Sequence, residues 1–203
     1  MIDGFNAPEK GNTAGILLAG GRATRMGGVN KGLMPFSGEP MAGRIIRRLR
    51  PQVGTIVASV NRDAEAYIEL GADLTIADRL TGFPGPLAAL DAAGTVTDAE
   101  WLLTVPCDVP LIPEDLLQKL SSGFAETHAP ALTVRADGRD QNTIALVHRS
   151  LLPTIRPFIE RGDRKLGLWF DENKRARVEW ADPGFGFVNV NSPEELLALE
   201  KAV

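Results

Sequence analysis

The sequence predicts an α/β fold: one domain built on a mostly parallel sheet flanked by helices, with an antiparallel extension in the second half. Two observations predict it. Short apolar segments alternate with helical segments through the first half, a rhythm typical of parallel sheets. In the second half, apolar segments 131–135 and 144–148 are joined through Asp137-Gly138, a dipeptide typical of turns between antiparallel strands.

The chain length of 203 residues fits a single domain. Residues 1–13 hold neither a basic stretch nor an apolar run, and we expect a flexible tail there and the domain at 14–203. The change of pattern divides that domain into a first half at about 14–110 and a second half at about 111–203.

The overall charge excludes several classes of protein. Lys and Arg number 22 against 26 Asp and Glu, a net charge of −4, so the surface as a whole does not attract nucleic acid and any anion site must be local. No apolar run approaches the ~18 residues of a membrane span, and the first residues lack the pattern of a signal peptide. A lone Cys107 fits a reducing compartment. We therefore expect a cytoplasmic protein without membrane contact, and a monomer.

The first half is expected to alternate strand and helix regularly. Residues 40–50 place Met41, Ile45, Ile46 and Leu49 on one helical face and arginines mostly on the other, the pattern of a helix packed on a sheet with a solvated outer face. The expected order is strand 16–18, helix 40–50, strand 54–60, helix 63–70, strand 74–77, helix 87–96 and strand 101–105.

The second half is less regular. A helix is expected from just after Pro113 to about Leu120, and the connection between the two apolar strands is longer than a tight hairpin. Residues 151–160 predict a helix that starts near Pro153 and breaks near Pro157, because proline lacks the amide donor of a helix interior. Further elements are a helix at 166–170, strands at 177–180 and 186–191, and a final helix through Leu199, opened by the capping box Ser-Pro-Glu-Glu at 192–195.

A glycine-rich loop follows the first strand and is cationic in an acidic protein. It runs Leu18-Ala19-Gly20-Gly21 and then carries Arg22, Arg25 and Lys31 without an intervening acid. Glycines let backbone amides approach an anion closely, so the loop is suited to phosphate. It is neither a Walker A motif, because Gly32 follows the lysine, nor a Gly-x-Gly-x-x-Gly fingerprint. The alternative is a tight strand-to-helix turn, which does not by itself require two arginines and a lysine.

Polar residues follow the other predicted strands. Asn61, Asp78 and Asp108 come directly after three of them, and in open α/β sheets ligands bind at that edge. Asp108, in Pro-Cys-Asp-Val-Pro, is the candidate Mg²⁺ ligand, since Mg²⁺ takes one or two carboxylates beside substrate phosphates. The alternative is a turn-stabilising aspartate. Cys107 has no basic neighbour that would form a thiolate, so we expect a buried filler.

Taken together, these motifs resemble the molybdenum cofactor guanylyltransferases of the MobA family of nucleotidyltransferases. The resemblance covers nearly the whole chain after the tail and rests on Leu18 to Gly21, Arg25-Met26-Gly27-Gly28, Lys31-Gly32, Asn61-Arg62, Pro84 to Leu87, Pro106 to Asp108, Thr143 to Leu146, and Val188 to Asn191 followed by Ser-Pro-Glu-Glu-Leu. It implies a Rossmann-like nucleotidyltransferase sheet, with GTP, Mg²⁺ and molybdopterin as participants and pyrophosphate as a product.

The resemblance also implies roles for individual residues. Nucleotide binding falls in the first half, on Leu18, Ala19, Gly20, Gly21, Lys31, Asn61, Asp78 and Asp108, and Asp108 would also hold Mg²⁺. Acceptor binding is implied for Arg25, Gly28, Lys165, Asn189 and Asn191. Arg25, Lys31 and Asp108 would be catalytic, offsetting charge as the acceptor phosphate attacks the α-phosphorus. Upstream cofactor-synthesis proteins and molybdoenzyme chaperones are the implied protein partners.

Three departures from the family pattern leave alternatives open. The family usually places Asp before the loop lysine, where this chain has Asn30; Gly is usual where it has Ala89, and His-Pro where it has Gln141-Asn142. One alternative is therefore a cofactor-binding or delivery module with weak turnover. Another is the related cytidylyltransferase, whose loop usually reads Leu-Ala-Ala-Gly instead of the Leu-Ala-Gly-Gly found here.

Overall fold

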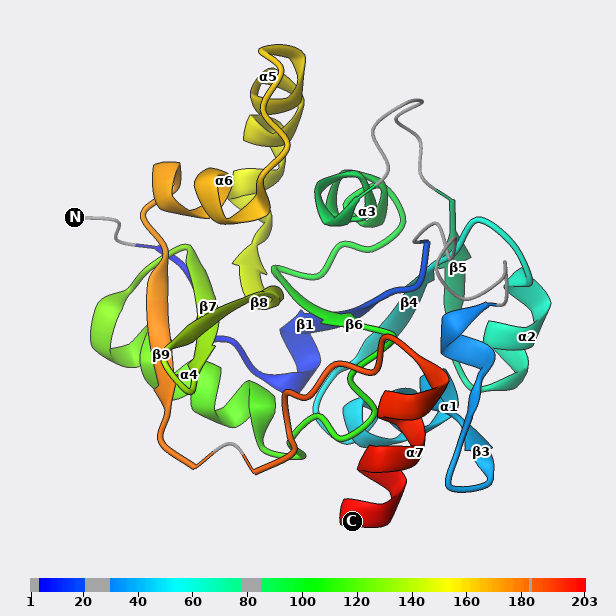
Figure 1. Cartoon of the computed structure of the whole chain (residues 1–203). Coiled ribbons are helices and arrows are strands. Elements are labelled where there is room, and N and C mark those ends of the chain that lie inside the picture. The colour runs from blue at the N-terminus through cyan, green and yellow to red at the C-terminus, as the bar shows by residue number, and fades with distance from the viewer. Residues whose placement is uncertain (1–3, 21–29, 78–84, 183) are drawn as a thin grey trace.

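The computed structural model describes residues 4–20, 30–77, 85–182 and 184–203, and within them a seven-stranded sheet forms the centre of the molecule (Figure 1). Its strand order is β5-β4-β1-β6-β8-β7-β9. The strands are β1 (Thr13–Leu18), β4 (Thr55–Ser59), β5 (Leu74–Ile76), β6 (Trp101–Pro106), β7 (Ala131–Ala136), β8 (Arg139–His148) and β9 (Ala176–Trp180). A small hairpin of β2 (Pro35–Phe36) and β3 (Glu39–Pro40) lies apart from this sheet.

Only one strand of the seven-stranded sheet runs against the others. β1 pairs in parallel with β4 and β6, β4 with β5, and β7 with β9, whereas β8 is antiparallel to both β6 and β7. The α/β class and the mostly parallel sheet with an antiparallel extension are thus confirmed. The strand order also reverses at β1, because β4 lies on one side of it and β6 on the other.

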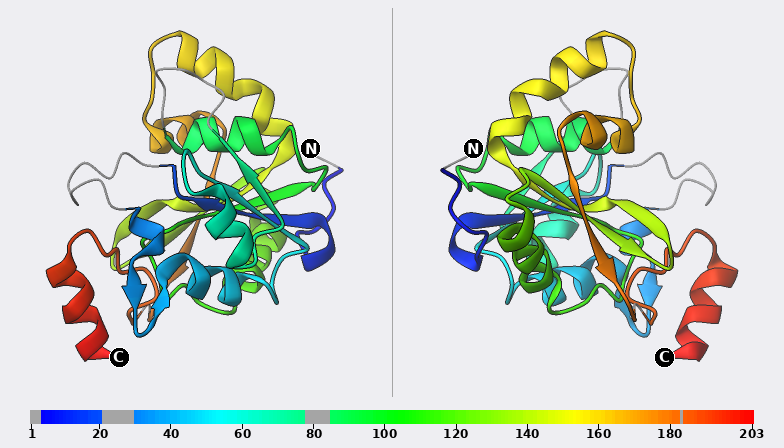
Figure 2. Two further views of the ribbon diagram at one scale, coloured as in Figure 1. Left: turned by 90° about the vertical axis from the view of Figure 1, so that its right-hand side faces the viewer. Right: turned by 90° about the vertical axis from the view of Figure 1, so that its left-hand side faces the viewer.

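Helices cover both faces of the sheet, as the two side views show (Figure 2). α1 (Met41–Leu49), α2 (Ala64–Glu69) and α4 (Leu116–Thr127) share one apolar core with the sheet. α3 (Pro86–Ala93), α5 (Ile155–Glu160) and α6 (Leu166–Glu172) share a second core on the opposite face. The last helix, α7 (Pro193–Ala202), packs through Leu196 and Leu199 against Phe36 and Met41. Within the described residues, no helix is long and apolar enough to cross a membrane.

The hairpin between β7 and β8 is tighter than the sequence predicted. Ala136 pairs with Arg139, so the loop has two residues, Asp137 and Gly138, and both have positive φ (49° and 70°). This conformation is that of a type I′ turn, whose twist matches the flanking strands. The prediction of a longer connection was wrong because the polar residues 139–143 were excluded from the strand, although they extend β8.

Two further elements of the second half differ from the prediction. The short 3-10 helix η4 (Arg149–Thr154) contains Pro153, and the α-helix begins only at Ile155. The expected break near Pro157 is wrong: Pro157 lies in the first turn of α5, where a backbone amide has no partner within the helix, so the helix runs on to Glu160. Residues 186–191 form no strand: they turn and then extend along the end of the sheet, where Val190 donates its amide hydrogen to the carbonyl of Asp108 at 2.8 Å. The two buried apolar residues of this segment, Phe187 and Val190, are three positions apart and enter two different cores.

Residues 4–12 lie along the opposite end of the sheet from those segments. The ring of Phe5 stacks on His148 at a centroid separation of 3.8 Å, and the indole of Trp101 donates to the carbonyl of Asn6 at 2.9 Å. The hydroxyl of Ser121 donates to the carbonyl of Pro8 at 2.8 Å. These contacts place the described part of the expected tail against β6, β8 and α4; its flexibility remains a prediction, which hydrogen exchange would measure.

Candidate active site

The candidate site lies at the carboxyl ends of β1 and β6, where the strand order reverses. The carbonyl of Leu18, the last residue of β1, accepts a hydrogen bond from the amide of Cys107 at 3.0 Å. The next residue, Ala19, donates to the carbonyl of Ser59 on β4 at 2.9 Å. The chain segments that leave β1 and β6 are thereby held side by side, which is the position where open α/β sheets bind ligands.

Three predicted site residues meet at one point. The Lys31 amine donates to Asp108 Oδ2 at 2.6 Å and to Asn191 Oδ1 at 2.9 Å. The Lys31 and Asp108 side chains are each 19% exposed, so the ion pair is shielded but open on one side. These residues are 77 and 160 positions from Lys31 in the chain, and the fold alone brings them together.

One of the two carboxylate oxygens of Asp108 has no hydrogen-bond partner among the described residues. Lys31 occupies Oδ2, whereas Oδ1 is buried and has no hydrogen-bond partner among the described residues. A buried carboxylate oxygen without a partner is costly, so it is typical of a position that a ligand completes. Across the described ranges, no group of three or more His, Cys, Asp or Glu side chains could hold a metal. A cation bound at Asp108 would therefore complete its coordination with substrate oxygens and water, as Mg²⁺ commonly does.

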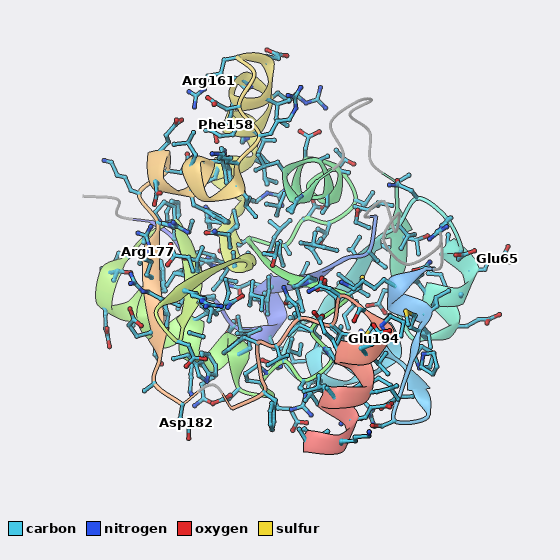
Figure 3. All side chains as sticks on the ribbon, viewed as in Figure 1. Glu65, Phe158, Arg161, Arg177, Asp182 and Glu194 are labelled. Atoms are coloured by element: carbon cyan, nitrogen blue, oxygen red, sulfur yellow. The ribbon has the colours of Figure 1, made fainter. Side chains whose placement is uncertain are left out.

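The start of α7 positions Asn191. Ser192 caps the helix, its hydroxyl accepting from the amide of Glu195 at 3.2 Å, as the sequence predicted. Glu195 does not complete the reciprocal capping box: its Oε2 accepts from the backbone amide of Asn191 at 2.6 Å. The carboxylate thus fixes the backbone that presents the Asn191 amide to Lys31. Figure 3 marks the neighbouring Glu194 in the same turn. Glu195 belonged to a recognisable motif, but its contact with Asn191 had no sequence signal.

A tight turn positions Lys31. The 3-10 helix η3 (Lys31–Leu33) is closed by the amide of Leu33 donating to the carbonyl of Asn30 at 3.0 Å and that of Met34 donating to Lys31 at 3.2 Å. Gly32, inside the turn, is buried. A side chain there would place Cβ 2.4 Å from the Tyr67 hydroxyl oxygen and 3.3 Å from Cys107 Cβ. The turn is therefore pressed directly against α2 and the end of β6.

We expect Gly32→Ala to lower the free energy of unfolding by about 1–3 kcal/mol, because the added methyl overpacks this contact. The control is Tyr67→Phe, which removes the oxygen that the methyl would meet. Urea unfolding should show that the two changes together cost less than the sum of the single changes. Strict additivity would contradict the close contact between Gly32 and Tyr67.

Asn61 and Asn189 are two further predicted site residues that the structure describes. The exposed Asn61 donates from Nδ2 to the carbonyl of Gly20 at 3.0 Å, so it holds the start of the glycine-rich loop. Asn189 is also exposed and lines a cavity of about 440 Å³ between the β7–β8 hairpin and residues 184–189, together with Arg139 and Gln141. Their assigned contacts with nucleotide and acceptor stay predictions.

The remaining predicted site residues fall into two sets. Lys165 is exposed at the N-cap of α6, and among the described residues no hydrogen bond or ion pair joins it to Lys31, Asp108 or Asn191. Gly21, Arg25, Gly28 and Asp78 lie outside the described residues.

Cys107 is a buried thiol next to Asp108. Burial, followed by the negative charge of Asp108, raises the pKa of Cys107 to about 12. The thiol therefore stays protonated at neutral pH and is not a nucleophile. Its Cβ fills space against Gly32, which agrees with its interpretation as a packing residue.

Asn142, one of the two residues that depart from the family's His-Pro, contacts a network of ion pairs. Arg175 is almost fully buried and donates to Asn142 Oδ1, to Asp140 Oδ2 at 2.9 Å and to Asp171 Oδ1 at 2.9 Å. Arg177, labelled in Figure 3, bridges the same two carboxylates. A proline at position 142 would offer no side-chain acceptor. Asn142 thus satisfies a guanidinium that ties β8, α6 and β9 together.

Comparison with known proteins agrees with this geometry. Residues 15–177 match the model of the MobA-like NTP transferase domain. The molybdenum cofactor guanylyltransferase of Shewanella amazonensis is 40% identical over 189 residues, covering 93% of this chain and 95% of that relative. The enzyme of that name from Burkholderia orbicola is 42% identical over 203 residues, covering 96% and 98%.

Solved structures share the fold at lower sequence identity. Molybdopterin-guanine dinucleotide biosynthesis protein A from Archaeoglobus fulgidus superposes with a TM-score of 0.75 at 18% identity, covering 93% of this chain and 97% of that one. A nucleotidyl transferase from Methanothermobacter thermautotroptrophicus gives 0.69 at 18%, covering 93% and 96%. By its family match and its relatives at about 40% identity, the chain belongs to the MobA-like NTP transferases, in the group of molybdenum cofactor guanylyltransferases.

Proposed function

We propose that the protein transfers GMP from GTP to molybdenum-bound molybdopterin, forming the guanine dinucleotide cofactor and pyrophosphate. The observation that carries the proposal is the contact of the Lys31 amine with both Asp108 and Asn191 at the carboxyl edge of the sheet. It joins a nucleotide-binding candidate of the first half to an acceptor-binding candidate of the second. Relatives that are similar to this chain over nearly their full length carry the name of this activity.

GTP is assigned to the segments that leave β1, β4, β5 and β6. Backbone groups of Leu18 to Gly21 and the side chains of Asn61 and Asp78 would bind the base, ribose and phosphates. Lys31 and Arg25 would offset the negative charge that develops as pyrophosphate leaves. The contact of Lys31 with Asp108 keeps its ammonium group beside the proposed phosphate site before substrate arrives.

Mg²⁺ is assigned to Asp108, through the buried oxygen Oδ1 that has no partner in the described part of the chain. When bound, the ion would neutralise phosphate charge and polarise the α-phosphate. Lys31 holds the other oxygen of the same carboxylate, so the protein fixes the carboxylate orientation without using the oxygen proposed for the metal.

The acceptor is assigned to Asn189, Asn191, Lys165, Arg25 and Gly28. The cavity lined by Asn189, two residues before Asn191, is the space proposed for part of the acceptor. In the reaction the terminal phosphate oxygen of molybdopterin forms a bond to the α-phosphorus of GTP, and the bond from that phosphorus to the β-phosphate oxygen breaks. A phosphate monoester is largely ionised near neutral pH, so the attacking oxygen needs no general base.

The test is pyrophosphate release by purified protein with Mg²⁺ and molybdenum-loaded molybdopterin, with GTP and CTP offered in parallel. Acceptor-dependent turnover with GTP and a product of the mass of the guanine dinucleotide support the proposal. Turnover with CTP instead identifies a cytidylyltransferase. Binding of GTP without pyrophosphate release identifies a binding or delivery module, the alternative that Asn30, Ala89 and Gln141-Asn142 leave open.

The setting of the reaction is proposed as a monomeric enzyme of the cytoplasm. The protein would receive its acceptor from upstream cofactor-synthesis proteins and release its product to a molybdoenzyme or its chaperone. Light scattering of the purified protein, with and without GTP, measures the oligomeric state directly.

A further inference from the structure

The side chain of Asn30, immediately before Lys31, bridges two residues of another segment. Its Nδ2 donates to Asp63 Oδ2 at 2.9 Å, and its Oδ1 accepts from the Tyr67 hydroxyl at 2.8 Å. Asp63 is the residue before α2, the helix on which Glu65 is labelled in Figure 3, and Tyr67 lies within that helix with no exposed surface. We call these three residues the Asn30 bridge.

The amide side chain of Asn30 satisfies both partners, which a carboxylate cannot do. The Asp63 carboxylate accepts hydrogen bonds and cannot donate them, whereas the Tyr67 hydroxyl uses its single hydrogen toward position 30. Position 30 must therefore donate on one side and accept on the other. A carboxylate at position 30, the usual choice in the family, would lie about 2.9 Å from a second carboxylate, a distance at which two like charges repel strongly.

Among the described residues, the surroundings of Asp63 offset only part of that repulsion. Arg62 is the described cation nearest to it, with Nε 3.9 Å from Asp63 Oδ2, and both side chains are about half exposed. The Lys31 ammonium is directed away, toward Asp108 and Asn191. Burial raises the pKa of Tyr67, which keeps its hydroxyl protonated as a donor.

The Asn30 bridge touches the lysine turn on both sides. Asn30 precedes Lys31 and its carbonyl closes the η3 turn, while the Tyr67 hydroxyl contacts the space beside Gly32, which follows Lys31. Moving the Asn30 side chain out of the bridge therefore shifts both ends of the segment that carries the lysine. The backbone conformation of Asp63, with φ at 57°, is one that Asn and Asp both tolerate.

We propose that Asn30 is a positioning residue which fixes the Lys31 turn against α2, and that Asp63 is the residue that requires an amide instead of a carboxylate at position 30. Asn30 and Asp63 then form a matched pair, and the departure from the family's usual Asp at position 30 leaves the site able to turn over GTP. The part concerning turnover rests on the proposed function, whereas the pairing itself does not.

The experiment exchanges the two groups. N30D places two carboxylates in contact, D63N keeps an oxygen that accepts from Asn30, and the double variant N30D/D63N restores one amide and one carboxylate in reversed order. Q118E on the exposed side of α4 is the matched control, since it adds the same single charge at a distance from the bridge. Melting temperature and kcat/KM for GTP are measured for all five proteins at pH 5 and pH 8.

We expect N30D at pH 8 to lose about tenfold in kcat/KM for GTP and to melt about 2–4 °C lower, while D63N, Q118E and the double variant stay near the wild type. The defect should shrink at pH 5. Two adjacent carboxylates share a proton, so one folded-state pKa is raised above its unfolded value of about 3.9. The loss of stability is then absent below the unfolded pKa and grows as the pH rises through the raised one.

Two results overturn the proposal. One is an N30D variant that melts like the wild type at both pH values; the other is a double variant that is no better than N30D alone. Both are read from unfolding and do not depend on turnover. A wild-type protein inactive with GTP would refute the proposed function, while the melting temperatures of the exchange would still decide whether Asn30 and Asp63 are matched.

Discussion

Replacing Asp108 with alanine is expected to reduce acceptor-dependent pyrophosphate release by at least about 10²–10³-fold, the usual cost of losing a group that stabilises charge at the reacting centre. The change removes the proposed Mg²⁺ ligand and also leaves Lys31 without its 2.6 Å partner. Pyrophosphate release is measured over a range of Mg²⁺ concentrations, and circular dichroism checks that the fold remains.

The control variant is Asp108→Asn, which keeps an oxygen for Lys31 and removes the carboxylate charge. If charge toward the metal is what matters, this variant should be nearly as inactive as Asp108→Ala and should need more Mg²⁺ for its residual turnover. Near-normal activity of Asp108→Ala would refute the assignment of Asp108 to both metal and catalysis.

Replacing Trp101 with alanine should have the largest effect on stability, about 3–5 kcal/mol of the free energy of unfolding. The side chain is fully buried at the start of β6, packs edge-on against Phe124 and His148 at centroid distances of 5.0 and 4.9 Å, and donates to the carbonyl of Asn6. Each lost kcal/mol lowers the melting temperature by about 2–4 °C in a protein of this size. Urea unfolding measures the effect.

Turnover should respond differently to the same change. Trp101 begins β6 and Asp108 follows the other end of that strand by two residues, so the two lie about 20 Å apart at 3.3 Å per residue. The folded fraction of Trp101→Ala should therefore keep a normal KM for GTP at low temperature. Trp101→Phe is the control, since it retains one aromatic ring while losing the indole donor and part of the ring volume. A large rise in KM for GTP in Trp101→Ala would show that the two ends are coupled.

The first half of the fold was predictable because its signals are local. Alternating apolar segments and amphipathic helices gave α1, β4, α2, β5, α3 and β6 with boundaries within a few residues. Predictions for the second half were wrong at the places where tertiary contacts override the local sequence pattern. β8 includes the polar residues 139–143 because they complete a two-residue hairpin, and residues 186–191, predicted as a strand, have no neighbouring strand to pair with.

The sequence predicted which residues belong to the candidate site, but it did not predict which of them contact one another. Strand ends and the glycine-rich loop pointed to Lys31 and Asp108, and the family resemblance added Asn191. Their meeting depends on chain segments up to 160 positions apart, which no local pattern encodes. Tyr67 and Asp63 were missed for the same reason: both are ordinary residues of a short helical segment, and only the packing of η3 on α2 gives them a partner in Asn30.

The last helix, α7, lies at the surface, yet it connects the C-terminal region directly to the candidate site. α7 begins directly after Asn191, packs on Phe36 and Met41, and reaches the β2–β3 hairpin through Glu200, which accepts a hydrogen bond from the amide of Ser37. A fusion partner or affinity tag joined after Val203 would disturb α7. This helix fixes the position of Asn191, whose side-chain oxygen accepts a hydrogen bond from Lys31. Expression vectors for enzymology should therefore carry their tags ahead of residue 4, at the opposite end of the sheet, where Phe5 and Asn6 lie far from the reacting centre.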